Sequence, residues 1–195
     1  MASLVHLVRH GEVENPENII YGELPGFGLS EEGLDQAKKV ARHLASRPIV
    51  AVWSSPLERA LSTAAEIAKP FGLSVRIDIE LGEWRGMEPW TGLKWEELPQ
   101  DLLQIYLDDP IRFEVGPETL QDLARRMSSA LTRVSESVQV GEIVVVSHQD
   151  PIQAARLTLT GGSLDRLSLD KPGHGSVVAL RPGNPWEEIP IWSLD

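Results

Sequence analysis

The sequence predicts an α/β fold, a three-layer α/β/α sandwich with a mostly parallel central sheet. Two apolar runs, Leu4–Val8 and Ile143–Val146, are typical of strands that are buried on both faces. Segments with apolar side chains at helical spacing alternate with such runs along the chain, which indicates a parallel sheet covered on both sides. The chain has 195 residues and no linker or low-complexity tract, so we expect one domain over residues 1–195.

Local signals assign the elements of the first half. Turn residues between Glu12 and Gly28 predict an irregular segment after the first strand. Ser30 is the predicted N-cap of a helix that runs to about Ser46. A short strand is predicted at Val50–Trp53, and the helix that follows it should begin with Ser55 as its N-cap.

The second half continues the alternation of strands and helices. Several Trp and Pro residues in Glu83–Gly116 predict an irregular excursion with one short helix. Asp150 is the predicted cap of a helix that runs to about Leu159. The remaining expected elements are a helix at Glu118–Val138 and strands at Ser74–Ile79, Ser176–Leu180 and Ile189–Trp192.

The composition restricts the possible partners. Lys plus Arg total 18 against 29 Asp plus Glu, a formal charge of −11, which disfavours nucleic acid or an anionic membrane as a partner. The absence of cysteine excludes disulfides and thiolate chemistry. No apolar run approaches the ~20 residues that span a bilayer, and the amino terminus does not resemble a signal peptide. We therefore expect a soluble, cytoplasmic protein that binds a small molecule.

The clearest functional signal is a pair of histidines at predicted strand ends. His10 follows Arg9 directly after the first strand, and His148 follows Ser147 directly after a later one. In open α/β sheets, ligands bind at the carboxyl ends of the strands. Arginine binds phosphate oxygens with its fixed fork of donors, and a neutral imidazole is a competent nucleophile. This combination predicts phosphoryl chemistry.

Three blocks in this order resemble the histidine phosphatase superfamily, which contains cofactor-dependent phosphoglycerate mutases and many phosphatases. The blocks are LVRHGE at 7–12, SSPLERALSTA at 54–64 and VVVSH at 144–148. The resemblance implies a phosphoglycerate mutase-like fold with His10 as the nucleophile. It also implies that Arg9, Arg59 and His148 bind the phosphoryl group and neutralise its charge.

The family also supplies a carboxylic acid that protonates the leaving group, and two alignments place it differently. One puts Glu83 there, within Leu81-Gly82-Glu83, and the other puts Asp78 there. We favour Glu83 because it keeps the acid a glutamate and the leucine two residues before it. A donor near neutral pH needs a pKa raised by burial.

The resemblance implies further substrate-binding positions besides Arg9, Arg59, Glu83 and His148. These are Gly11, Asn15, Gly22 and Gln149. The family pair that falls on Glu118 and Arg126 is expected to be structural. Two other histidines, His6 and His43, are interpreted as structural or solvated. His174, between Gly173 and Gly175, could approach the site from a loop, but the structural interpretation is favoured for it too.

The favoured function is a phosphomonoester hydrolase with a phosphohistidine intermediate on His10 and no metal or cofactor. The substrate is expected to be a small phosphorylated metabolite. Family mutases usually have more chain between the glutamate and the late histidine, which favours hydrolysis over the alternative, a cofactor-dependent phosphoglycerate mutase. A second alternative is a non-catalytic domain that binds a phosphoryl ligand or a protein. The sequence leaves the oligomeric state open.

Overall fold

The computed structural model describes residues 1–190, which form a six-stranded sheet with the order β3-β2-β4-β1-β5-β6. The first four strands in this order are parallel, and β5 and β6 continue the sheet in antiparallel fashion. The expectation of a mostly parallel sheet is therefore confirmed. The strands are β1 (Leu4–Arg9), β2 (Ile49–Ser54), β3 (Val75–Ile77), β4 (Glu142–Ser147), β5 (Val177–Arg181) and β6 (Glu187–Ile189).

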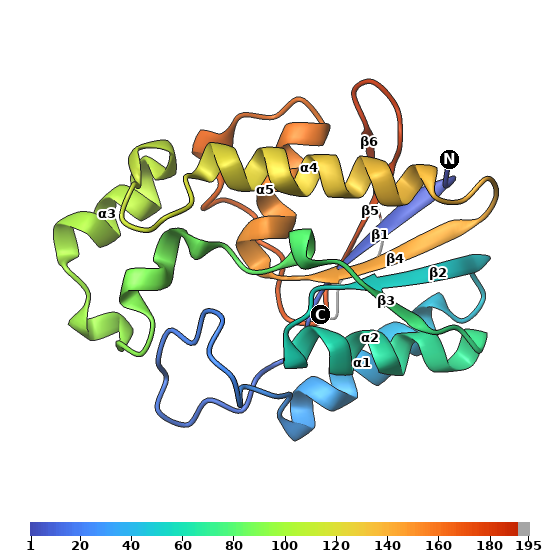
Figure 1. Ribbon diagram of the computed structural model, residues 1–195, viewed down its shortest axis with the longest axis horizontal. Helices are drawn as coiled ribbons and strands as arrows, with labels where there is room; N and C mark the ends of the chain where they lie inside the picture. Colours follow the sequence, from blue (N-terminus) through green and yellow to red (C-terminus); the bar gives the residue numbers. More distant parts are fainter. Residues whose placement is uncertain (191–195) are drawn as a thin grey trace.

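Helices cover both faces of the sheet, which confirms the three-layer sandwich (Figure 1). One face carries α1 (Glu31–Leu44) and α2 (Glu58–Ala68). The other carries α4 (Leu120–Glu136) and α5 (Gln149–Leu159), while α3 (Gln100–Asp108) lies beyond the carboxyl ends of the parallel strands.

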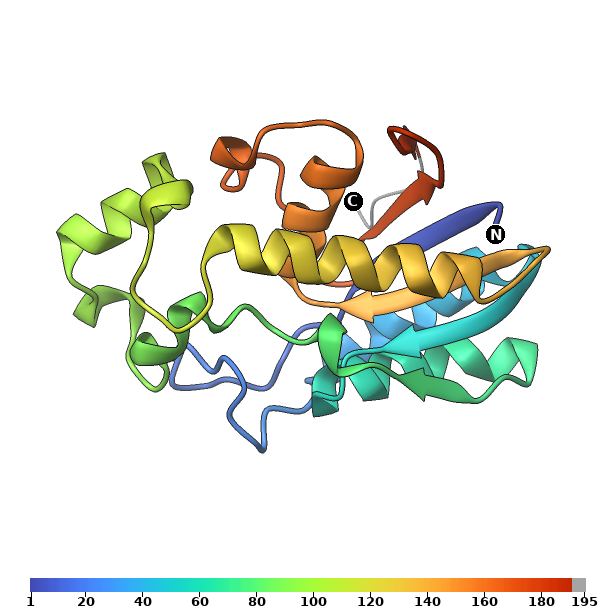
Figure 2. The same cartoon turned by 45° about the horizontal axis from the view of Figure 1, so that its top comes forward.

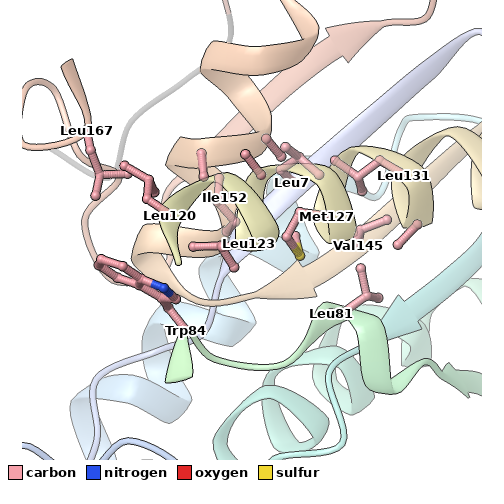
Figure 3. Close-up of a cluster of buried hydrophobic side chains, with 14 of the residues drawn as sticks. Leu7, Leu81, Trp84, Leu120, Leu123, Met127, Leu131, Val145, Ile152 and Leu167 are labelled. Carbon is pink, nitrogen blue, oxygen red and sulfur yellow. The ribbon is translucent and has the colours of Figure 1, made fainter. Parts of the chain in front are cut away.

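Alternate side chains of each central strand enter different cores, which explains the continuous apolar runs. Leu7 of β1 and Val145 of β4 pack with Met127 and its neighbours on α4 (Figure 3). Val8 and Val146, one residue further along each strand, pack on the opposite face with α1 and α2. Both strands are thus buried on two sides and hold the residues that follow them in fixed positions.

Two predicted helix caps were wrong. The helix α2 begins at Glu58 rather than after Ser55, whose Oγ is hydrogen-bonded to His148 Nε2 at 2.8 Å. The helix α5 begins at Gln149 rather than after Asp150, whose carboxylate accepts hydrogen bonds from other elements. In both cases the polar side chain that the local sequence predicts as a cap is hydrogen-bonded to residues distant in the sequence.

The other element predictions agree with the structure to within a few residues. Ser30 caps α1 by accepting a hydrogen bond from Gly33 N at 3.0 Å. The excursion between β3 and α4 contains one α-helix, α3, and several short 3-10 helices, as expected. The last predicted strand is found at Glu187–Ile189, and its expected extension over residues 191–192 lies outside the described residues.

Two irregular segments project beyond the carboxyl ends of the parallel strands (Figure 2). One is the segment 12–28 and the other is the excursion 82–118. The excursion has its own aromatic core, in which the ring centroid of Phe113 lies 5.6 Å from that of Trp84 and 4.9 Å from that of Trp90. A cavity of about 770 Å³ lies between the two segments and the strand ends.

The exit of β1 passes directly against the start of α1, and only glycine fits there. A Cβ added to Gly11 would lie 2.3 Å from the carbonyl oxygen of Gly33. Because the atoms that the added methyl group would meet are all backbone atoms of Gly33, Gly11→Ala should lower the free energy of unfolding by about 1–3 kcal/mol in urea titrations. The control is Gly173→Ala, where an added Cβ meets no atom within 4 Å. Equal stability of the two variants would contradict this account of Gly11.

Candidate active site

The two histidines meet at the ends of adjacent parallel strands. Arg9, the last residue of β1, is in register with Ser147, the last residue of β4. His10 and His148 follow them directly, and their ring centroids lie 5.1 Å apart. Both side chains are buried. The position expected for both from the sequence is confirmed.

His10 is held in one orientation with one ring nitrogen presented to the site. Its Nδ1 donates to the carbonyl oxygen of Gly11 at 2.8 Å, which assigns the proton to Nδ1. Its Nε2 accepts a hydrogen bond from Arg59 Nε at 3.2 Å. Burial, followed by the charge of Arg59, holds the pKa of His10 well below its usual value. His10 is therefore neutral near pH 7 and has a lone pair on Nε2.

Arg59 connects His10 to the other groups of the site from the first turn of α2. Its Nη2 donates to the carbonyl oxygen of Gly22 at 2.8 Å and lies 3.5 Å from Glu83 Oε2. Its guanidinium carbon lies 4.7 Å from the ring centroid of Tyr21, a cation–π distance. The side chain is buried, so its charge acts at close range on the imidazole and the carboxylate.

Glu83, rather than Asp78, lies with the histidines. Glu83 Oε2 lies 3.6 Å from His148 Nδ1, and Glu83 Oε1 accepts a hydrogen bond from Trp84 N at 2.9 Å. Burial raises the pKa of Glu83 against the opposing charge of Arg59. Asp78 caps a short 3-10 helix, pairs with Arg133, and does not line the cavity.

Two buried donors at the strand ends have no hydrogen-bond partner within residues 1–190. They are Arg9 Nε and His148 Nδ1. The Glu83 carboxylate lies 3.6 Å from His148 Nδ1, which favours the proton there, and Ser55 Oγ can then donate its hydroxyl hydrogen to His148 Nε2; we assign the proton of His148 to Nδ1. Unpaired buried donors are costly, which indicates that an acceptor from a ligand belongs beside them.

His174 is a site residue that sequence reasoning missed. It was interpreted as structural, but its Nε2 accepts a hydrogen bond from Arg9 Nη2 at 2.8 Å, and its ring centroid lies 5.6 Å from that of His10. Burial and the charge of Arg9 lower the pKa of His174 to about 4. The only feature of the local sequence that could have indicated a site residue is its position between Gly173 and Gly175. By contrast, His6 is structural as expected, with its Nε2 bonded to the buried Glu142.

The remaining predicted positions lie on the cavity wall. The side-chain amide of Asn15 exchanges two hydrogen bonds with the backbone of Ile19, so it shapes the segment 12–28. Gln149 Nε2 donates to the carbonyl oxygen of Pro172 at 3.1 Å, as does Arg9 Nη1 at 3.0 Å. Six of the predicted site residues line the cavity: Arg9, His10, Asn15, Gly22, Glu83 and Gln149. Gly11, Arg59 and His148 do not line it but contact residues that do, since Gly11 and Arg59 are hydrogen-bonded to His10 and His148 lies beside Glu83.

Comparison with known proteins decides the family. The family model of the histidine phosphatase superfamily, branch 1, matches residues 5–189. The chain belongs to the histidine phosphatase superfamily. It is therefore an enzyme of the phosphoric monoester hydrolase class, and its fold is the phosphoglycerate mutase-like fold of its structural neighbours.

Its relatives in the superfamily include both uncharacterized proteins and phosphatases. An uncharacterized protein of Mycobacterium tuberculosis is 45% identical over 166 residues, which cover 82% of this chain and 80% of that protein. Phosphoserine phosphatase 1 of Hydrogenobacter thermophilus is 35% identical over 168 residues, covering 83% and 78%. The structure of a mycobacterial glucosyl-3-phosphoglycerate phosphatase with VO3 has a TM-score of 0.85 and 26% identity, covering 96% and 97%.

The described part of this phosphatase contains neither a cluster of metal-binding side chains nor a helix that could span a membrane. Within residues 1–190, no three His, Asp or Glu side chains are grouped as a metal site would require. No helix in the same range is long and apolar enough to cross a membrane.

The Glu118–Arg126 pair anchors the segment that carries Glu83 in this histidine phosphatase. Arg126 makes a two-pronged ion pair with the buried Glu118, with Nε–Oε1 at 2.7 Å and Nη2–Oε2 at 3.0 Å. Its other hydrogens are donated to the carbonyl oxygens of Glu80, Gly82 and Glu83. The structural role expected for the pair is thus confirmed, and it also fixes the backbone of Glu83.

Arg126→Ala leaves a buried carboxylate and several carbonyl groups without their donor. We expect it to lower the free energy of unfolding by about 3–5 kcal/mol. The matched control is the neighbouring Arg125→Ala, which removes an exposed pair with Asp122 and should cost less than about 1 kcal/mol. Urea titrations of both variants measure the difference. Similar losses for the two arginines would contradict this role for Arg126.

Proposed function

We propose that this chain hydrolyses a small phosphomonoester through a phosphohistidine intermediate on His10. One observation carries the proposal. A buried, neutral imidazole presents Nε2 to a site where the Arg59 guanidinium and two unpartnered donors, Arg9 Nε and His148 Nδ1, are held. A phosphoryl group supplies the acceptor oxygens that these donors lack, next to a nucleophile.

In the first half-reaction, His10 Nε2 attacks phosphorus and the P–O bond to the leaving group breaks. Arg9, Arg59 and His148 stabilise the charge on the equatorial oxygens, so the Arg59 Nε bond to His10 gives way to one with phosphate. Glu83 transfers its proton to the departing alkoxide, which would otherwise leave poorly. Burial raises the pKa of Glu83, which favours the protonated form that this step requires.

In the second half-reaction, the Glu83 carboxylate takes a proton from water as the water oxygen attacks the phosphoryl group. The P–N bond to His10 breaks, phosphate is released, and His10 and protonated Glu83 are restored. Gly11 and Gly22 orient His10 and Arg59 through their carbonyl groups, and Asn15 and Gln149 line the path of the substrate.

Phosphate release measures this function directly. The wild-type protein, with a chelator present, is expected to release phosphate from a panel of alkyl and sugar phosphomonoesters. The same samples are assayed for phosphoryl transfer between phosphoglycerates, the reaction of the mutase alternative. Release with little transfer supports hydrolysis, whereas transfer that exceeds release contradicts it. Loss of activity in chelator that added metal restores would contradict the metal-free route.

A further inference from the structure

The outer part of the cavity is a built surface, formed by two segments that are paired through their backbones. Ile20 N donates to the carbonyl oxygen of Leu93 at 2.8 Å, and Gly92 N donates to the carbonyl oxygen of Ile20 at 2.8 Å. A β-bridge joins Ile19 to Lys94. The segment 12–28 and residues 91–95 therefore form one wall, whose side chains meet the part of a substrate that lies beyond the phosphoryl group.

Large apolar side chains cover much of this wall. Leu24 and Trp95 line the cavity although they are 37% and 40% exposed, and Ile19 and Met87 line it with them. Exposed hydrophobic side chains that gather in one cavity are typical of a surface that a ligand covers.

The charged side chains that line the cavity away from the histidines are mainly negative. Glu23 and Glu88 line it there, whereas Arg85 is the only cation on the described lining besides Arg9. Lys171 is near the inner wall, but it is bound to Asp150 and to the hydroxyl of Tyr106. A leaving group with its own carboxylate would meet like charges there and a single opposing one.

We infer that the leaving group of the natural substrate is apolar and carries no negative charge. The inference rests on the proposed function, because it concerns the alcohol that departs when His10 takes the phosphoryl group. It separates this chain from relatives whose names specify phosphoserine or glucosyl-3-phosphoglycerate, both of which carry a carboxylate. The alcohol would lie against Trp95, Met87 and Leu24.

Three alkyl phosphates test the inference: methyl phosphate, benzyl phosphate and 4-carboxybenzyl phosphate. Benzyl phosphate should exceed methyl phosphate in kcat/KM by at least about tenfold, because the ring is buried against the apolar wall. The added carboxylate should lower kcat/KM by about threefold for each glutamate near 6 Å, and less at high salt. A preference for the carboxylated ester, or equal values for methyl and benzyl esters, would overturn the inference.

Matched variants locate the effect in the wall. Trp95→Ala should lower the benzyl-to-methyl ratio by about two- to tenfold, while Leu107→Ala, an exposed position on α3 outside the cavity, should leave it unchanged. The double variant Glu23→Gln/Glu88→Gln should raise the ratio of kcat/KM for the carboxybenzyl ester to that for the benzyl ester by about tenfold. The control Glu96→Gln, exposed and outside the cavity, should not. If Trp95→Ala left the benzyl-to-methyl ratio of kcat/KM unchanged, and the double glutamate variant left the carboxybenzyl-to-benzyl ratio unchanged, the inference would be overturned.

Binding separates this inference from the proposed function. If no ester is hydrolysed, the proposed function fails, and calorimetric affinities of the three esters for the wild-type protein still decide the inference. Tighter binding of benzyl phosphate than of the other two supports it. The reverse order contradicts it, whether or not turnover occurs.

Discussion

Replacing His10 by alanine is expected to lower kcat for phosphomonoester hydrolysis by at least about 10⁴-fold, because it removes the nucleophile and leaves only binding and charge stabilisation. Steady-state phosphate release from benzyl phosphate measures the loss. Removing the buried imidazole also removes its hydrogen bond to Gly11, so circular dichroism and urea unfolding should accompany the kinetics. A folded variant with this loss is the expected result.

The control for His10 is His43→Ala, which removes a histidine from α1 outside the cavity. It should retain the activity of the wild type. The activity that remains in His10→Ala should be far lower than roughly a tenth of the wild-type rate. If the folded variant released phosphate at that rate or faster, the nucleophile would have to be another group.

Glu83→Gln should have the second largest effect, a loss of about 10²–10⁴-fold in kcat for alkyl phosphates, since the proton for the alkoxide is no longer supplied. With 4-nitrophenyl phosphate the leaving phenolate needs no proton. The variant should then release one equivalent of nitrophenol in a rapid burst and turn over slowly, because water attack on the phosphoenzyme also requires Glu83. Stopped-flow absorbance measures the burst.

Glu96→Gln, an exposed carboxylate outside the cavity, is the matched control and should behave as the wild type. Wild-type turnover of alkyl esters by Glu83→Gln would contradict the acid role. If Asp78 were the donor instead, Asp78→Asn would show the large loss, although it would also break the pair with Arg133.

The pH dependence should follow from the environment of Glu83. Burial raises its pKa, so the protonated fraction persists to higher pH than for an ordinary glutamate and falls as pH rises through the raised value. His10, whose pKa is lowered, stays neutral over the same range. The rate for alkyl esters should therefore fall on the alkaline side, and this fall should be absent in Glu83→Gln. If the rate of Glu83→Gln still fell at alkaline pH, another group would be responsible for that fall.

The central sheet and the inner site could be predicted because their determinants are local. The apolar runs within β1 and β4 are interrupted only by His6, and the residues directly after each run lie at the same end of the sheet. Arg59 lies at the same end of the sheet, because it is in the first turn of the helix that follows β2. The end of a parallel strand therefore predicts where the next side chains lie.

The caps and the loop histidine could not be predicted because distant residues decide them. Ser55 has a sequence context that favours an N-cap, but its hydroxyl bonds to His148, which is remote in sequence. Asp150 likewise binds Tyr106 and Lys171. His174 lies in a loop without periodicity, and only the fold places it beside Arg9.

The outer cavity could not be derived for a related reason. Its wall depends on backbone pairing between Ile20 and Leu93, which no periodicity or capping pattern announces. The tryptophans also differ in a way that the sequence does not specify, since Trp84 and Trp90 are buried in the core whereas Trp95 is 40% exposed on the cavity wall. The shape and lining of the outer cavity therefore follow from the structure alone.

The most direct test of the account is the identity of the phosphorylated residue. Glu83→Gln is mixed with 4-nitrophenyl phosphate, quenched in alkali within the burst, digested and analysed by mass spectrometry. We expect a phosphoryl group on the imidazole of His10 that is stable in alkali and lost in acid. A burst with phosphate on another residue, or turnover with no phosphorylated protein at any time, would contradict it.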